Sequence, residues 1–455
     1  MARPFFALIN AGCEFVLNAV ASAFSSSLVR CSLLLSLYLA SVFTSPVRPY
    51  GHIIVNWSSL EQTIDGFGAE AASDIKLSPA MMDFFYTDAG IHLSLLRVEI
   101  YPDLADCESG HCVPSEKATI LKNALANAKA AASRGALVWG TEGSPPGYMK
   151  SSGSWGKGGS FLGGATNFAQ YADIQASFVS LMAANGVPVY AVSVQNEPDL
   201  HTSCTWTARQ IHDYIPYLYA TLSGAGYSSV KIMIEEQSGW NNTLSTTAMN
   251  DPAIAAKVGI LAEHAYVGKP SRLLWSNMTT QHVWQTEVSD LNPYDGSITS
   301  GLKYATEIHN WLTTAMVNSW HYFDLALFND VNDNEGLTDN ALNVAKRAYA
   351  IGNFAKFVRS GWTRVDVTNA TGLLVSAYRG RSGAAIVVIN HGSAVNNQMF
   401  SVGTTMGSSV IPWITSSTLN LSSQTPVIVS SRAFTYTIPA KSIVTFSTPL
   451  QPLDP

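Results

Sequence analysis

The chain has 455 residues, of which 47% are hydrophobic and only 13% are charged, and its net charge is −6 at pH 7. This length is too great for one ordinary domain, and the apolar content is sufficient for a large core. The weak negative charge excludes the basic surface that nucleic-acid binding requires, so we expect no nucleic-acid partner.

The first 48 residues differ in texture from the rest of the chain. Arg30 is followed by an apolar run from Leu33 to Phe43 and then by small residues, the pattern of a secretory leader. The run is shorter than the about 20 apolar residues of a membrane span, but it begins far from Met1. We therefore expect residues 1–48 to be a signal peptide or an anchor, and the mature protein to be secreted without a membrane partner.

Strand-like and helix-like segments alternate from residue 49 to residue 360. The strand candidates are short runs rich in β-branched and aromatic residues, separated by segments of helical periodicity. Eight strands alternating with helices are typical of an α/β protein with a (β/α)₈ TIM barrel. The candidates are Thr63–Ala69, His92–Ile100, Ala136–Thr141, Val189–Glu197, Val230–Glu235, Val258–Tyr266, Gln281–Val288 and Tyr322–Phe328.

Residues 361–455 have a different pattern, with short β-type runs, turn residues and no helical period. This pattern predicts an attached antiparallel β-sandwich side domain. The segment Ile53–Trp57 is a strand candidate outside the barrel, and we expect it to join the side domain. The predicted organisation is a catalytic barrel over 49–360 and a side domain over 361–455.

Two glutamates are predicted to stand at the ends of barrel strands. Glu197 ends the apolar run that begins at Val189, and Pro198 stops this strand because it has no N–H for the ladder. Glu287 ends the run that begins at His282. A strand-end Glu can cap a helix or pair with an Arg, but barrel enzymes hold their chemistry at this end. Two carboxyl groups about 5 to 5.5 Å apart would suit retaining glycoside hydrolysis.

The five cysteines give no clear metal signature. Cys107 and Cys112 flank a short polar loop and would form a small disulfide in an oxidising compartment. A metal site is the weaker interpretation, because only His111 is near and the chain has no second pair of this kind. We expect no metal and no organic cofactor, since glycoside hydrolysis needs only water.

Four motifs are spread along the chain: IDGFG at 64–68, SPPGYMK at 144–150, QNEPD at 195–199 and WQTEV at 284–288. Together they resemble glycoside hydrolase family 30, in particular its xylanase and glucuronoxylanase-like subfamilies. The resemblance extends from about Val55 to Thr448. The motif QNEP alone would indicate only a wider clan of retaining barrel glycosidases, whereas the combination is specific.

The resemblance implies a retaining mechanism with Glu197 as the acid/base and Glu287 as the nucleophile. It also implies that Asn196 hydrogen-bonds the sugar 2-hydroxyl, that Tyr266 hydrogen-bonds the nucleophile and that Arg97 keeps the nucleophile ionised. From the residues alone, Arg97 is equally well interpreted as part of a structural ion pair and Tyr266 as a packing residue.

Two departures from the family pattern concern the substrate. The glucuronoxylanases carry an Arg-rich segment after the eighth strand that binds glucuronate, whereas Leu327–Gly336 contains no Arg and several acids. These acids would repel a carboxylate. A Trp is usual just before Ser144, where this chain has Glu142 and Gly143. Glu142 either binds a sugar hydroxyl or is a loop residue, and Trp139 either replaces the missing Trp or does not.

Other tryptophans follow or lie near predicted strand ends. Each is individually a better candidate for packing, but we expect one or two to stack on the substrate. These are Trp155, Trp206, Trp240, Trp275 and Trp320.

We therefore expect a secreted, monomeric endo-glycosidase that acts on plant cell-wall polysaccharide. The first candidate is an endo-β-1,4-xylanase without strict dependence on glucuronate. Endo-β-1,6-galactanase and β-1,6-glucanase activities are alternatives within the same family. A non-catalytic carbohydrate-binding protein is the alternative from another class, but such a protein usually lacks one of the two glutamates.

Overall fold

The computed structural model describes residues 51–71, 75–100, 114–275, 281–327, 332–368, 370 and 372–448, with the backbone alone over 114–120. The predicted leader and the pair Cys107 and Cys112 lie outside these residues. Within the part of the chain that is described, no helix combines the length and the apolar character needed to cross a membrane.

Eight parallel strands close into a barrel, which confirms the predicted (β/α)₈ fold. They are buried along most of their length, as expected for parallel strands that are covered on both faces. The bounds predicted for the eighth strand are wrong: it runs over Ser319–Tyr322, and the buried apolar residues Leu325–Leu327 follow it in an irregular segment. The strands are β2 (Gly66–Glu70), β3 (Leu95–Ile100), β4 (Leu137–Glu142), β5 (Val189–Ser193), β6 (Lys231–Gly239), β7 (Val258–Val267), β8 (His282–Glu287) and β9 (Ser319–Tyr322).

Two tryptophans fill the interior of the barrel. Trp139 and Trp284 are fully buried and meet edge to face, with ring centroids 6.0 Å apart. The Nε1–H of Trp139 donates to Nε2 of His321 at 3.1 Å. Both tryptophans lie within their strands and not at the carboxyl ends, so their rings form a packed layer below the mouth of the barrel.

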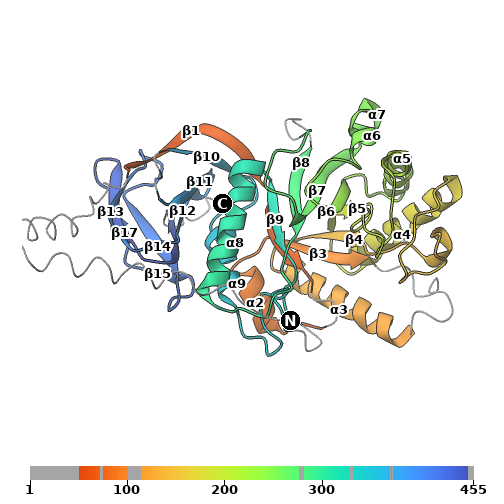
Figure 1. Ribbon diagram of the computed structural model, residues 1–455, viewed down its shortest axis with the longest axis horizontal. Coiled ribbons are helices and arrows are strands. Elements are labelled where there is room, and N and C mark those ends of the chain that lie inside the picture. Colours follow the sequence, from red (N-terminus) through yellow and green to blue (C-terminus); the bar gives the residue numbers. More distant parts are fainter. Residues whose placement is uncertain are drawn as a thin grey trace, which may run out of the picture. The chain divides into compact units, whose positions relative to one another are not determined.

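Helices follow most of the strands and pack around the barrel, as Figure 1 shows. They are α2 (Pro79–Tyr86), α3 (Pro114–Ala132), α4 (Ala165–Ala184), α5 (Ala208–Gly224), α6 (Thr246–Met249), α7 (Pro252–Ala255), α8 (Ile298–Asn310) and α9 (Lys346–Ala355), with the 3₁₀ turn η2 (Gly147–Met149) and the π turn η3 (Trp311–Ala315). A capping box starts α5: the Thr207 side chain accepts from the Gln210 N–H, and the Gln210 side chain accepts from the Thr207 N–H. This cap fixes where the chain turns back after the loop that carries Glu197.

The side domain is one ten-stranded sheet that curls over an apolar core. Its strands are β1 (Ile53–Ile64), β10 (Trp362–Thr368), β11 (Leu374–Gly380), β12 (Gly383–Asn390), β13 (Val395–Ser401), β14 (Ser409–Thr415), β15 (Ser422–Ser423), β16 (Val427–Ile428), β17 (Ala433–Ile438) and β18 (Ser442–Ser447). Their order is β15-β14-β18-β12-β11-β10-β1-β13-β17, and β16 pairs with β14. Most neighbours are antiparallel, but β1 and β13 are parallel, so the sheet is mixed.

The strand β1 precedes the barrel in sequence but belongs to the side sheet. It pairs antiparallel with β10, the first strand after the barrel, and Ile64 lies opposite Trp362. The two strands run side by side in Figure 1. The chain therefore enters and leaves the barrel at neighbouring points.

Helix α9 joins the barrel to the sheet, since it contacts β2 on one side and β14 and β18 on the other. Its Asn353 donates from Nδ2 to Oγ1 of Thr445 at 2.9 Å, and its carbonyl accepts from the same hydroxyl at 2.7 Å. Nζ of Lys346 donates to the carbonyl of Leu419 at 3.0 Å. These contacts hold the side sheet on the barrel without an extended linker.

Candidate active site

Two neighbouring regions of the barrel mouth carry the predicted carboxylates. Glu287 is the last residue of β8, whereas Glu197 lies in the loop beyond β5, so the prediction that this strand reaches Glu197 is wrong. The loop is held by the adjacent strands β4 and β6. The N–H of Asn196 donates to the carbonyl of Glu142 at 2.8 Å, and the N–H of Glu197 donates to the carbonyl of Glu236 at 3.0 Å. These bonds fix Glu197 in the left-handed region, with φ of 47°.

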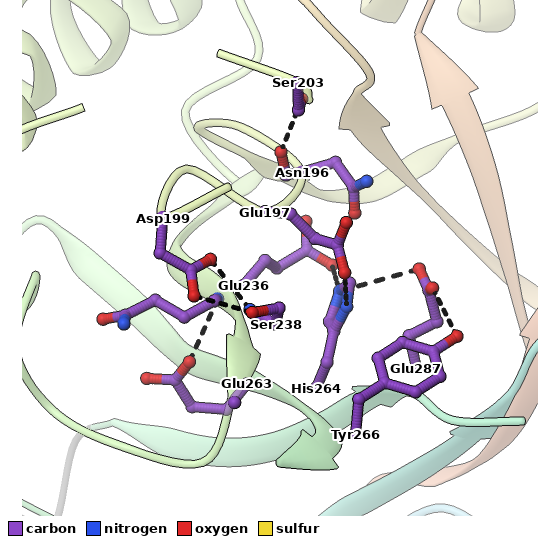
Figure 2. A network of polar contacts seen from close by, with 12 residues as sticks. Asn196, Glu197, Asp199, Ser203, Glu236, Ser238, Glu263, His264, Tyr266 and Glu287 are labelled. Carbon is purple, nitrogen blue, oxygen red and sulfur yellow. Dashed lines mark hydrogen bonds and ion pairs between the residues drawn. The ribbon is translucent and has the colours of Figure 1, made fainter. Parts of the chain in front are cut away.

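The imidazole of His264, on β7, lies between the two glutamates (Figure 2). Its Nδ1 is 3.3 Å from Oε1 of Glu197, and its Nε2 is 3.6 Å from Oε2 of Glu287. One carboxylate oxygen from each glutamate and one ring nitrogen all lie within 4.8 Å of one another. The geometry thus brings both predicted carboxylates and a titratable ring into one cluster.

The ring of His264 is a cation at neutral pH. Burial alone would lower its pKa, but the charge of Glu287 and hydrogen bonds with Glu197 and Glu236 raise the pKa to about 10. With both nitrogens protonated, the ring has no lone pair for a metal ion. Two carboxylates and a histidine meet here, and the ring would have to release a proton before it could bind a metal ion.

Arg97, on β3, is a second buried cation at the same place. Its Nη1 contacts Glu287 and lies 2.9 Å from Oε2 of Glu70, and its Nη2 donates to Oδ1 of Asn196 at 2.5 Å. Burial opposes the charge, but the carboxylates of Glu70, Glu287 and Glu236 raise the pKa of Arg97 above its usual value. This side chain ties Glu287 to the residue that precedes Glu197.

Tyr266 donates its hydroxyl hydrogen to Oε1 of Glu287 at 2.8 Å, while 40% of the residue remains exposed at the mouth. Burial of the hydroxyl and the charge of Glu287 raise the pKa of Tyr266. The hydroxyl therefore remains a donor throughout the neutral range, and Glu287 accepts hydrogen bonds from both Tyr266 and Arg97.

Three ionisable residues of this cluster are absent from the sequence-based prediction: Glu70, Glu236 and His264. Burial raises the pKa of Glu70 to about 7, although Arg97 opposes this shift. Burial would also raise the pKa of Glu236, but the charges of Arg97 and His264 hold it at about 2. For His264, the alternation of side chains along β7 could have given a signal in the sequence, because it places His264 on the same face as Tyr266.

A cavity of about 800 Å³ opens over this cluster. Its lining is strongly acidic, with Arg97 as the one basic residue among the described lining residues. The wall includes Glu70, Arg97, Glu99, Thr141, Gly143, Asn196, Glu197, Leu200, Ser238, Tyr266, Val267, Glu287, Ser289, Asp290, Leu291, Phe323 and Glu335. Five of the eight predicted site residues therefore reach the cavity: Arg97, Asn196, Glu197, Tyr266 and Glu287.

The other three predicted site residues do not line the cavity. Trp139 is fully buried in the barrel interior, and Trp206 stacks on Phe161 with ring centroids 3.9 Å apart. Glu142 is also fully buried, and its charge acts on Tyr171 and Tyr214 of the surrounding helices. Its neighbours in the chain explain this: Thr141 on β4 and Gly143 just beyond it line the cavity, so the intervening side chain points the other way.

The expected aromatic platform is also missing from the described wall. None of the five tryptophans proposed for it lines the cavity, where the aromatic rings are those of Tyr266 and Phe323. Glu99 occupies the space beside Gly143: a Cβ added to this glycine would lie only 1.8 Å from Oε1 of Glu99. A carboxylate thus stands next to the position where the family resemblance implies an indole.

No protein-family model matches the chain. Among curated proteins, a glucuronoxylanase XynC from Bacillus subtilis (strain 168) is 30% identical over 91% of this chain and 97% of its own length. Among solved structures, the glycoside hydrolase family 30 subfamily 8 xylanase Xyn30A from Clostridium acetobutylicum is 32% identical, with a TM-score of 0.76 over 87% of this chain and 99% of its own. A family 30 endoxylanase from Clostridium papyrosolvens C71 is 29% identical, with a TM-score of 0.73 over the same shares.

Proposed function

Because the chain belongs to glycoside hydrolase family 30, we propose that it is a retaining endo-β-1,4-xylanase in which Glu197 is the acid/base and Glu287 the nucleophile. The observation that carries this proposal is the separation of the two carboxylates, whose nearest oxygens lie within 4.8 Å. Retaining glycosidases hold their carboxyl groups about 5 to 5.5 Å apart, whereas inverting enzymes need about 6.5 to 9.5 Å to admit a water molecule.

The surroundings of each glutamate support its role. Glu287 accepts hydrogen bonds from Arg97 and Tyr266, which stabilise the carboxylate that attacks the anomeric carbon. Oε1 of Glu197 lies 3.3 Å from Nδ1 of His264, and this contact fixes the direction in which the carboxyl group of Glu197 points. Arg97 orients Asn196 by donating to its Oδ1, which supports a role for Asn196 in binding the sugar 2-hydroxyl.

Azide rescue tests the mechanism. A Glu197→Ala variant supplied with azide should regain part of its turnover and release a β-glycosyl azide, because azide attacks the glycosyl-enzyme from the face that water normally uses. The matched Glu287→Ala variant should give the α-azide, since azide then replaces the nucleophile itself. An α-product from Glu197→Ala would contradict the assignment and indicate an inverting enzyme.

The charge of the cavity supports a xylanase that does not depend on glucuronate. Glu99, Asp290 and Glu335 line the wall, while Arg97, the one cation among the lining residues that the structure describes, is already bound to carboxylates. Burial and the charges of Asp333 and Glu287 raise the pKa of Glu335, as expected for a carboxyl group in an acidic site. Such a wall attracts no anionic substituent.

Product profiles on linear xylan, glucuronoxylan and β-1,6-galactan test the substrate. We expect oligosaccharides from both xylans at similar rates. Cleavage of glucuronoxylan alone would contradict the proposal that the enzyme does not depend on glucuronate. Cleavage of the galactan alone would identify the enzyme as an endo-β-1,6-galactanase, the alternative within the family. The β-1,6-glucan serves as a fourth substrate for the same purpose.

The polymeric nature of the proposed substrate also supports action outside the cell, by a secreted monomer that needs no cofactor. Protein sequencing of the extracellular product should find an N-terminus near residue 49, and light scattering should give the mass of one chain. A retained N-terminal segment would instead support the anchor interpretation.

A further inference from the structure

The end of β6 has an unusual backbone. Glu235 and Glu236 are consecutive non-glycine residues with positive φ, of 82° and 53°. The pairing with β7 shifts register here, because Glu235 lies opposite Ala262 while Gln237 lies opposite Glu263. L-residues rarely adopt this conformation, and two in succession in a strand indicate a local constraint. The bulge directs the two neighbouring carboxyl groups to different surroundings.

The carboxylate of Glu236 enters the catalytic cluster from below. It is fully buried, and its Oε2 accepts from Oγ1 of Thr141 at 2.5 Å. Its Oε1 lies 3.4 Å from Nη2 of Arg97 and 3.7 Å from Nε2 of His264. Figure 2 shows the side chain of Glu236 ending beside the ring of His264.

The same residue also acts through its main chain. The carbonyl of Glu236 accepts the N–H of Glu197 at 3.0 Å. Two residues further along, Ser238 donates from its N–H and its hydroxyl to the carboxylate of Asp199, at 2.9 and 2.7 Å. The bulged end of β6 therefore holds the loop that carries Glu197 at two points, the N–H of Glu197 and the carboxylate of Asp199.

The charges around Glu236 show why a carboxylate is needed there. Arg97 from β3 and His264 from β7 are the cations that face it. Glu287 from β8 approaches both cations, Glu70 from β2 approaches Arg97, and Glu197 approaches His264. Without Glu236, Arg97 would keep Glu70 and Glu287 as ionic partners and His264 would keep Glu197 and Glu287, but neither cation would be held from the side of β6. An ionised Glu236 shares these cations with Glu287.

We propose that Glu236 is a positioning residue for hydrolysis, whose carboxylate holds Arg97 and His264 in place against the two catalytic glutamates while its carbonyl fixes the backbone of Glu197. The inference rests on the proposed function of this site. Glu236 does not touch the reacting atoms, so its effect should appear in turnover and in the charge of His264 rather than in substrate affinity.

The decisive experiment compares Glu236→Gln with Glu235→Gln. Both substitutions keep side-chain length and lie in the same buried bulge, but Glu235 faces Glu263 instead of Arg97 and His264. With xylohexaose as substrate, we expect kcat to fall by about 10²-fold in Glu236→Gln at a nearly unchanged KM, as for other losses of alignment. Glu235→Gln should keep kcat within about two-fold of the parent enzyme.

Two further measurements separate positioning from simple support of the fold. Nitrogen-15 NMR of labelled histidine should show the pKa of His264 falling in Glu236→Gln, because the ring loses an anionic partner 3.7 Å away. Glu236→Asp retains the charge and should recover part of the lost turnover. If Glu236→Gln does not fold, the turnover of Glu236→Asp and the titration of His264 in that variant still test the proposal.

An unchanged kcat and an unchanged His264 titration in folded Glu236→Gln would overturn the proposal. Equal losses in Glu236→Gln and Glu235→Gln would also overturn it, because they would reflect the bulge alone. An inactive parent enzyme would refute the proposed function instead, and the NMR titration would still report on the contact between Glu236 and His264.

Discussion

The mouth of the barrel and the centre of the side sheet are buried to similar extents but consist of opposite kinds of residue. At the mouth, Arg97, Glu236, His264 and Glu287 are at most 7% exposed, and all four are ionisable. In the sheet, the rings of Phe400, Phe434 and Phe446 pack with centroids 4.8 to 5.1 Å apart. Burying ions costs stability, whereas burying rings provides it. We therefore expect substitutions at the mouth to change activity and substitutions in the sheet to change stability.

The largest effect should come from Glu287→Gln. An amide cannot form the glycosyl-enzyme, so kcat should fall by about 10⁴-fold or more, as it does when other enzymes lose a nucleophile. The amide oxygen can still accept from Arg97 and Tyr266, so the protein should fold with a similar Tm. Kinetics on xylan and thermal unfolding measure the two quantities, and Asp83→Asn on the exposed surface of α2 is the control. Near-normal turnover would refute the nucleophile assignment.

Phe446→Ala should have the reverse effect. Removing this ring from the sheet core leaves a cavity and should lower the free energy of unfolding by about 3 to 5 kcal/mol. Because the sheet supplies no lining residue of the described cavity, kcat at 25 °C should remain that of the parent. Met399→Ala, at a 45% exposed position of the same sheet, is the matched control. A large loss of kcat in the folded variant would mean that the two regions are coupled.

Tyr266→Phe should sharpen the comparison within the mouth itself. The change deletes one hydrogen bond to Glu287 and little apolar surface, so we expect a fall of about 10²-fold in kcat, the scale seen when one preorganised donor is removed. Thermal unfolding should change little. Tyr219→Phe, on the exposed face of α5, controls for loss of a tyrosine hydroxyl. Equal kinetics in the two variants would leave Tyr266 as a packing residue.

The smallest effect concerns the pH dependence of stability. Burial raises the pKa of Glu235 from 4.5 to about 8, so this group favours the folded state fully below pH 4.5, and the contribution is lost as pH rises through 8. Glu235→Gln remains neutral throughout. Urea unfolding at pH 5 and pH 7 should therefore show the parent losing on the order of 2 kcal/mol relative to the variant. Parallel stability curves would show that Glu235 is ionised in the folded protein.

The barrel and the location of Glu197 and Glu287 at its mouth were predictable because strand periodicity and turn residues are local signals, although β5 ends before Glu197. Trp139 and Trp206 were misplaced because residue type alone does not give depth along a strand or packing against a neighbouring ring. Glu236 was not predictable at all. A regular strand alternates its faces, and the bulge at Glu235 breaks this alternation without leaving any recognisable residue pattern in the sequence.

The antiparallel pairing of β1 with β10 has a consequence for biosynthesis. Ile64 must wait for Trp362 to emerge before the two can pair. At about 5 to 20 residues per second, translation of the about 300 intervening residues takes about 15 to 60 s. Throughout that interval neither edge of β1 has its partner, because β10 and β13 are both still to be synthesised. An unpaired strand of this kind is the condition under which nascent chains aggregate or recruit chaperones. Nascent chains that end before residue 362 should therefore be the species most dependent on cellular protection.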